Sequence, residues 1–116
     1  MLGLRTIIYK VEDLEEATLW YSKVFEMEPY FKEPFYVGFN IGGYELGLLP
    51  ERSVKGNNII TYWGVKDIEE AFKKCLSLGA TSIEKPNNVG GELMVATVED
   101  LWGNKIGLIY NPYFKL

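Results

Sequence analysis

Two charged residues, Glu45 and Lys105, hold equivalent places in two similar segments, GYELGLL at 43–49 and GNKIGLI at 103–109. A carboxylate and an ammonium group that face one cavity can act on a substrate as base and cation, or they can pair with each other. Charged side chains at such places are more often solvated residues at the rim of a site. The sequence therefore leaves three alternatives open for these residues: an acid–base function, a charged pair inside the cavity and a solvated rim.

Few other side chains are available for chemistry, because the 116 residues include no histidine and only one cysteine. Histidine is the commonest metal ligand and the side chain best suited to proton transfer near neutral pH. Cys75 lies on the apolar stripe of a predicted helix with no histidine to activate its thiol, which favours a structural role. A metal-free acid–base mechanism would then depend on Glu45, Lys105 or a tyrosine.

The composition excludes several classes of partner. The net charge is −4, with 12 Lys and Arg against 16 Asp and Glu and no run of basic residues, so we expect neither nucleic acid nor an anionic membrane surface as a partner. No apolar stretch approaches the roughly 20 residues of a membrane span. A single cysteine cannot form an intrachain disulfide and is compatible with a reducing compartment, so we expect a cytoplasmic protein.

A near-repeat organises the chain: VEDLEEA at 11–17 returns as VKDIEEA at 65–71. In each copy an aspartate, Asp13 or Asp67, is followed three residues later by a glutamate, which is typical of a helix N-terminus. Apolar residues at helical spacing follow both aspartates and predict two amphipathic helices. Gly79 offers a left-handed stop after the second helix, whereas the first copy has Glu26 near the corresponding place.

Short runs rich in β-branched and aromatic residues surround the two helices and predict one strand before each helix and three after it. The expected strands lie at 4–11, 30–35, 36–42 and 44–49 in the first half, and at 58–65, 81–86, 92–100 and 104–111 in the second. The prediction is an α+β fold in one domain, 1–116, of two tandem βαβββ modules that form a curved mixed sheet around a cup. Module one is 1–50, a polar linker is 51–58 and module two is 59–116.

This tandem arrangement resembles the glyoxalase, bleomycin-resistance and extradiol-dioxygenase superfamily, also called vicinal oxygen chelate proteins. IIYKVEDLEEATLWYSKVF and YWGVKDIEEAFKKCLSLGA are similar to the starts of its two modules, and VEDLWGNKIGLIYNP at 98–112 to its closing motif. The resemblance implies a divalent metal in the cup, with ligands at one point on the first strand and one on the last strand of each module. In this sequence those points fall on Thr6, Ile60, Gly47 and Gly107.

These four residues do not supply metal donors. A divalent cation needs several O, N or S donors, and a hydroxyl, an alkyl group and two glycines provide one weak neutral oxygen. We therefore expect no metal and no cofactor. The small residues are expected to enlarge the cup for a ligand that approaches the backbone closely.

Strand alternation identifies the candidate ligand-binding residues of the cup, with Trp102 added from a turn. Tyr62 is expected to stack on a ligand or to belong to the core, and Trp102 to act as a lid or a dimer contact, while Trp63 is expected in the core. The candidate set is Thr6, Ile8, Glu45, Gly47, Ile60, Tyr62, Trp102, Lys105 and Gly107.

Three functions are compatible with these observations. The first is a metal-independent small-molecule-binding protein that sequesters an aromatic or apolar ligand, because 15% of the residues are aromatic and the ligand points lack donors. The second, from the family resemblance alone, is a lyase, isomerase or dioxygenase-type enzyme. The third is a scaffold without a ligand. A homodimer is expected in each case, because sheet edges and apolar faces of such modules are commonly buried between chains.

Overall fold

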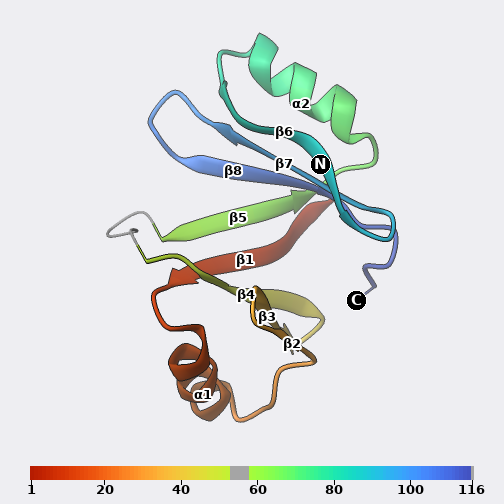
Figure 1. The fold of residues 1–116 in the computed structure, drawn as a ribbon. Coiled ribbons are helices and arrows are strands. Elements are labelled where there is room, and N and C mark those ends of the chain that lie inside the picture. Colours follow the sequence, from red (N-terminus) through yellow and green to blue (C-terminus); the bar gives the residue numbers. More distant parts are fainter. Residues whose placement is uncertain (53–57, 116) are drawn as a thin grey trace. The chain divides into compact units, whose positions relative to one another are not determined.

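The computed structural model describes residues 1–52 and 58–115 (Figure 1). The chain divides into two compact units, Thr6–Ile59 and a second unit that joins Met1–Arg5 to Ile60–Lys115. The division falls beside the start expected for module two, and the first five residues belong to the second unit. Most of the linker predicted at 51–58 falls on residues 53–57 and lies outside the described residues.

The first module has the element order predicted for it (Figure 1). Its strand order is β2-β3-β4-β1; β1 runs parallel to β4, and the other two pairs are antiparallel. Apolar side chains of β3 and β4 pack with those of α1 to form the module's core. The elements are β1 (Gly3–Val11), α1 (Leu14–Phe25), β2 (Phe31–Glu33), β3 (Tyr36–Ile41) and β4 (Tyr44–Pro50).

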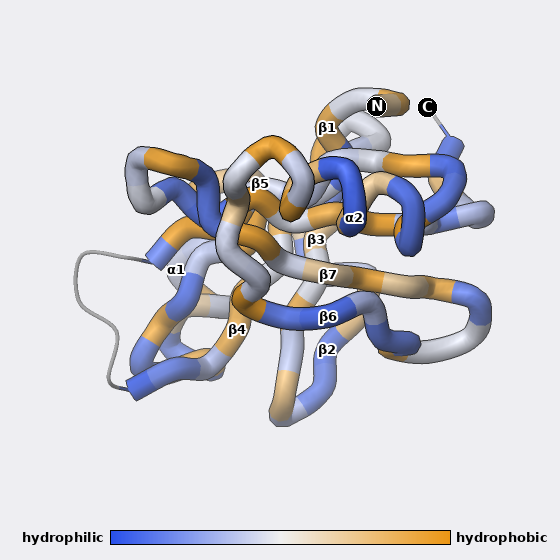
Figure 2. The backbone as a smooth tube through the Cα atoms, turned by 90° about the horizontal axis from the view of Figure 1, so that it is seen from above, coloured by the Kyte–Doolittle hydropathy of each residue, from blue (hydrophilic) through white to orange (hydrophobic). Residues whose placement is uncertain are grey.

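The second module repeats this order, with strands β5-β8-β7-β6 and a parallel β5–β8 pair. Figure 2 shows that β7 is largely apolar and that the outer strand β6 is largely hydrophilic. Such a polar edge strand discourages pairing with other chains. The elements are β5 (Ile59–Gly64), α2 (Ile68–Ser77), β6 (Thr81–Gly90), β7 (Leu93–Glu99) and β8 (Lys105–Tyr110). The α+β class and the tandem βαβββ order are confirmed, whereas the cup between the modules stays a prediction.

Both helices begin where the aspartates predicted. The Asp13 side chain accepts a hydrogen bond from the Glu16 backbone N–H at 3.0 Å, and Asp67 accepts one from the Glu70 N–H at 3.1 Å. At the first helix's end Glu26 adopts a left-handed conformation with φ of 54°, which is rare for a residue with a side chain. Neither helix, nor any other among the described residues, is long and apolar enough to cross a membrane.

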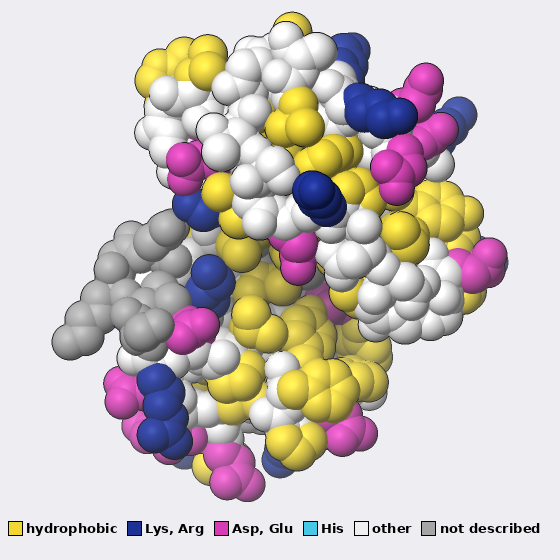
Figure 3. All heavy atoms as spheres, turned by 45° about the horizontal axis from the view of Figure 1, so that its top comes forward, with side chains coloured by type: hydrophobic (Ala, Val, Ile, Leu, Met, Phe, Trp, Pro, Cys, Tyr) yellow, Lys and Arg dark blue, Asp and Glu magenta, His cyan; other side chains and the backbone are white. Residues whose placement is uncertain are grey.

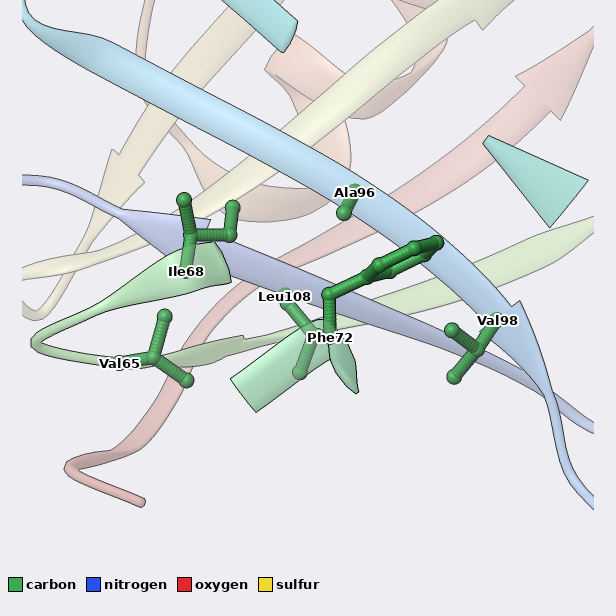
Figure 4. Packing of buried hydrophobic residues seen from close by; sticks show 6 residues of the cluster. All are labelled: Val65, Ile68, Phe72, Ala96, Val98 and Leu108. Carbon is green, nitrogen blue, oxygen red and sulfur yellow. The ribbon is translucent and has the colours of Figure 1, made fainter. Parts of the chain in front are cut away.

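The core of module two lies between α2 and the sheet (Figure 4). The Phe72 ring from α2 packs with Ala96, Val98 and Leu108 from β7 and β8. Trp63 is absent from this core, so its predicted burial was wrong: 37% of the residue is exposed. Its indole Nε1 donates to the Thr61 Oγ1 at 3.2 Å, which satisfies the polar edge of the ring near the surface.

Candidate functional site

The sheet of module one brings four of the predicted site residues together. In the parallel pairing of β1 with β4, Thr6 lies opposite Glu45 and Ile8 lies opposite Gly47. Because side chains alternate along a strand, these four share the face opposite the core residues of α1, β3 and β4. Thr6 and Ile8 are buried, and Glu45 is half-buried.

Glu45 is held by two tyrosines. The hydroxyl groups of Tyr30 and Tyr36 each donate a hydrogen bond to one of its carboxylate oxygens. Burial, followed by the hydrogen bond to Glu45 and by its negative charge, raises the pKa of Tyr30 above the ordinary tyrosine value. Tyr30 therefore remains a protonated donor across the physiological pH range, and the carboxylate keeps a fixed position.

Tyrosine rings also cover the glycines of this face. A β-carbon at Gly47 would overlap the Tyr36 ring, and one at Gly38 would lie 3.1 Å from the Tyr30 Cε1. The expectation that the small residue at Gly47 enlarges the cup is therefore wrong. The missing side chain is replaced by a phenol ring that reaches over from the neighbouring strand.

An aromatic surface adjoins the carboxylate. The Phe31 ring lies 6.5 Å from Tyr30, 6.2 Å from Phe35 and 6.1 Å from Tyr36, centroid to centroid. Tyr30 and Phe35 are each 63% exposed, and Phe31 is 39% exposed. A group of exposed rings on one short segment is unusual and is typical of a binding surface. We call these residues, Tyr30, Phe31, Phe35, Tyr36 and Glu45, the Glu45 aromatic cluster.

Module two places Tyr62 directly against Gly107, its partner in the β5–β8 register. A β-carbon at Gly107 would lie 2.5 Å from the Tyr62 Cδ1, so this glycine is likewise covered by a ring. The pKa of Tyr62 is raised, mainly by burial. A hydrogen bond with Thr97 lowers this pKa in part, and the negative charge of Glu84 raises it further. Tyr62 is thus a neutral phenol that spans Gly107 and reaches the next strand.

The remaining predicted residues have other surroundings. Lys105 forms an ion pair with Glu99 of its own module, with 2.6 Å between Nζ and Oε1. Each member of the Glu45–Lys105 pair therefore has a partner within its own module. Trp102 is 80% exposed in a turn, where Asp100 accepts from its backbone N–H. Ile60 is half-buried on β5.

The turn that carries Trp102 is organised by Asp100. Its carboxylate accepts from the side chain and the backbone N–H of Asn104, at 2.9 and 2.8 Å, and from the Trp102 N–H at 2.8 Å. These hydrogen bonds, that of the Asn104 side chain first, lower the pKa of Asp100. The geometry is that of a tight polar turn and brings no chemistry to Trp102.

The metal implied by the resemblance does not fit these residues. Gly47 and Gly107 offer no donor and are covered by rings, Ile60 is an alkyl group, and Thr6 provides one neutral hydroxyl. Throughout residues 1–52 and 58–115, no group of three or more Cys, Asp or Glu gathers where it could hold a metal ion. We therefore assign no step to a metal at these positions.

Four residues that contact the predicted site were not among the predicted site residues: Tyr30, Tyr36, Thr97 and Glu84. Thr97 and Glu84 are brought to Tyr62 by the strand register, because Thr97 lies opposite both Gly107 and Glu84 in the sheet. For Tyr30 and Tyr36 the sequence holds a signal, the segment YFKEPFY at 30–36, where four of seven residues are aromatic. A dense aromatic run beside a strand glycine on the same face indicates that a ring fills the glycine's space.

Comparisons with known proteins extend this description. The Glyoxalase/Bleomycin resistance protein/Dioxygenase superfamily matches residues 3–108. Among curated proteins, none matches the chain.

Several solved structures share the fold. A hypothetical protein from Bacillus halodurans is 18% identical, with a TM-score of 0.79 and coverage of 97% of this chain and 96% of its own. A variant of Streptomyces coelicolor methylmalonyl-CoA epimerase in complex with 2-nitronate-propionyl-CoA is 12% identical, with a TM-score of 0.77 and coverage of 100% and 99%. A superfamily member from Vibrio splendidus is 15% identical, with a TM-score of 0.73 and coverage of 93% and 99%.

At these identities the structures establish the fold alone. The match over residues 3–108 spans most of the sequence and both modules, and the tandem βαβββ order agrees with it. The chain belongs to the Glyoxalase/Bleomycin resistance protein/Dioxygenase superfamily.

Proposed function

We propose that this chain is a metal-independent small-molecule-binding protein and that the Glu45 aromatic cluster is its binding surface. The observation that carries the proposal is the carboxylate of Glu45, fixed by two phenols beside rings that remain exposed. A carboxylate with both oxygens already bonded to phenols is oriented before a ligand arrives. Preorganisation of this kind favours binding, because less conformational freedom is lost on association.

The chemistry of the cluster favours a particular kind of ligand. Aromatic faces attract flat apolar bodies and cations, and Glu45 adds a negative charge at their edge. The net charge of −4 also favours a cationic ligand over an anionic one at this surface. The proposed ligand is therefore an aromatic or apolar molecule that carries an amine or another cationic group.

Binding should depend on the carboxylate. We expect Glu45→Gln, which keeps the shape of the side chain and removes its charge, to weaken binding of a cationic aromatic compound by about tenfold, as expected for a charged hydrogen bond. Glu28→Gln is the matched control, because Glu28 is exposed and outside the cluster. Tyrosine fluorescence and thermal stabilisation in a panel of cationic, neutral and anionic aromatic compounds provide the measurement.

Two outcomes would exclude this surface. One is a panel in which no cationic aromatic compound raises the melting temperature. The other is a compound that binds Glu45→Gln as tightly as it binds the wild type and the Glu28→Gln control.

Lyase, isomerase or dioxygenase activity is the second candidate, supported by the superfamily and by the likeness to an epimerase. The site favours it less, because the residues at the expected ligand points do not fit a metal. Hydrogen–deuterium exchange at carbon in a bound ligand, followed by NMR, would detect an isomerase. Exchange that is catalysed by the wild type and lost in Glu45→Gln would favour an enzyme over a binding protein.

We also propose that the protein acts as a homodimer, and α1 provides the surface that supports this. Three of its large apolar residues are more than half exposed: Leu19 at 62%, Trp20 at 58% and Val24 at 51%. Such a group of neighbouring apolar side chains on one helix is typical of protein interfaces.

Nucleic acid is not favoured as a partner. On the face shown in Figure 3, Lys and Arg side chains are dispersed among Asp and Glu, whereas a nucleic-acid-binding surface gathers positive charge.

A further inference from the structure

A pocket of about 260 Å³ lies within the second unit and shares no residue with the Glu45 aromatic cluster. Apolar residues make up much of its lining, among them the buried Val65 and Ile109 and the half-buried Phe114. Its volume lies just below the roughly 300–1,000 Å³ of sites that hold drug-sized ligands. The pocket is therefore suited to a small ligand with an apolar body.

Four side chains of the lining carry hydrogen-bond donors: Arg5, Lys66, Asn111 and Tyr110, whose hydroxyl can also accept. Arg5 and Lys66 are cations with no acceptor atoms. The side-chain oxygen of Asn111 accepts from the Tyr113 backbone N–H at 2.9 Å, and the amide N–H₂ of the same side chain is a further donor group. Of the described residues, no Asp or Glu lines the pocket. In a chain of net charge −4, this concentration of donors and positive charge selects an anion.

Arg5 is positioned by its neighbours. Its guanidinium carbon lies 4.0 Å from the centroid of the Phe114 ring, and its Nη1 donates to the Leu4 carbonyl at 3.2 Å. Gly64 leaves the room for this side chain, since a β-carbon there would lie 2.9 Å from the Arg5 Nε. A guanidinium whose carbon lies over a ring still carries N–H groups along its edge, and such an edge matches the two oxygens of a carboxylate.

We propose that this pocket binds a small monocarboxylate with an apolar body. The planar fork of Arg5 fits a carboxylate, Lys66 adds a second positive charge, and the apolar lining accommodates an aryl or short alkyl group. An inorganic phosphate would leave this apolar lining without a partner. Because the site lies in the other unit from Glu45 and takes a ligand of opposite charge, it goes beyond the proposed function and can fail independently of it.

The test is a titration of the full chain with benzoate and with benzamide, its neutral counterpart, followed by amide chemical shifts in NMR. We expect benzoate to shift the signals of residues 64–66 and 109–111 with saturation, and benzamide to bind at least about tenfold more weakly, as for loss of a charged bidentate contact. Arg5→Gln should weaken benzoate binding by a similar factor. Arg5→Lys, which keeps the charge without the fork, should lie between Arg5→Gln and the wild type.

Lys73→Gln is the matched control, because Lys73 is exposed on α2 and does not line the pocket. Lys66→Gln is a second variant that leaves Arg5 and its contacts in place, so the test does not depend on the folding of the Arg5 variants. Equal binding of benzoate and benzamide, or shifts absent at benzoate concentrations up to about 20 mM, would overturn the proposal. Phosphate binding as tightly as benzoate would overturn the assignment to a carboxylate.

Discussion

Gly47→Ala tests whether the Tyr36 ring replaces a side chain on the sheet of module one. The added β-carbon would overlap the ring, whose Cζ and Cε1 would lie at 2.6 and 2.8 Å, and Gly47 is buried. Tyr36 would have to move, and with it the hydrogen bond to Glu45. Overpacking of this kind costs about 1–3 kcal/mol, and loss of a hydrogen bond to a charged group about 1.5–3 kcal/mol.

One opposing effect must be subtracted. Alanine is favoured over glycine in a strand by about 0.5–1 kcal/mol. The expected net destabilisation is about 1.5–5.5 kcal/mol, which urea unfolding followed by circular dichroism can measure. In the double variant Gly47→Ala/Tyr36→Ala the overlap is absent, so the two changes should not be additive. A Gly47→Ala protein as stable as the wild type, or changes that add within about 0.5 kcal/mol, would show that the Tyr36 ring does not fill the space beside Gly47.

Three further predictions concern Tyr62, the N-terminus of α2 and the exposed face of α1. Burial raises the pKa of Tyr62, so the free energy of unfolding should fall as the pH rises above about 10, the pKa of tyrosine in the unfolded chain. Urea unfolding at alkaline pH should show a smaller fall for Tyr62→Phe, and an equal fall in both proteins would contradict this. Asp67→Ala removes the N-cap of α2 and should destabilise by about 1 kcal/mol in thermal melts, whereas Glu69→Ala at an exposed first-turn position should have a smaller effect. Trp20→Glu should shift sedimentation from dimer toward monomer at micromolar concentration, and a wild type that is monomeric under these conditions would count against the α1 interface.

The repeated motif was a good guide to the fold because its signals are local. Asp13 and Asp67 determine where the helices begin, and turn residues separate the strands; both depend on neighbours within a few positions. The prediction for β6 ended at residue 86, whereas the strand continues to Gly90. The hairpin turn lies at Gly91 and Glu92, and φ is positive at Gly90 and Gly91, a conformation that glycine adopts without strain.

The site was harder to predict because its contacts join residues that are distant in sequence. Glu45 was identified as a candidate, but its partners Tyr30 and Tyr36 depend on the register of β2, β3 and β4. Gly47 and Gly107 have no side chains that could bind a metal, but the space beside each glycine is filled by a tyrosine ring from a neighbouring strand. The Arg5 pocket was not predicted because its residues come from three segments that are distant in sequence, at 2–5, 64–66 and 109–114.

Binding of a cationic aromatic ligand with and without a chelator distinguishes a metal-independent binding protein from a metal-dependent one. The protein is purified without added metal, its metal content is measured by elemental analysis, and the ligand is titrated calorimetrically before and after treatment with EDTA. For a metal-independent protein we expect less than a stoichiometric amount of any transition metal and the same affinity in both titrations. One tightly bound ion for each chain, with ligand binding abolished by EDTA, would contradict metal-independent binding.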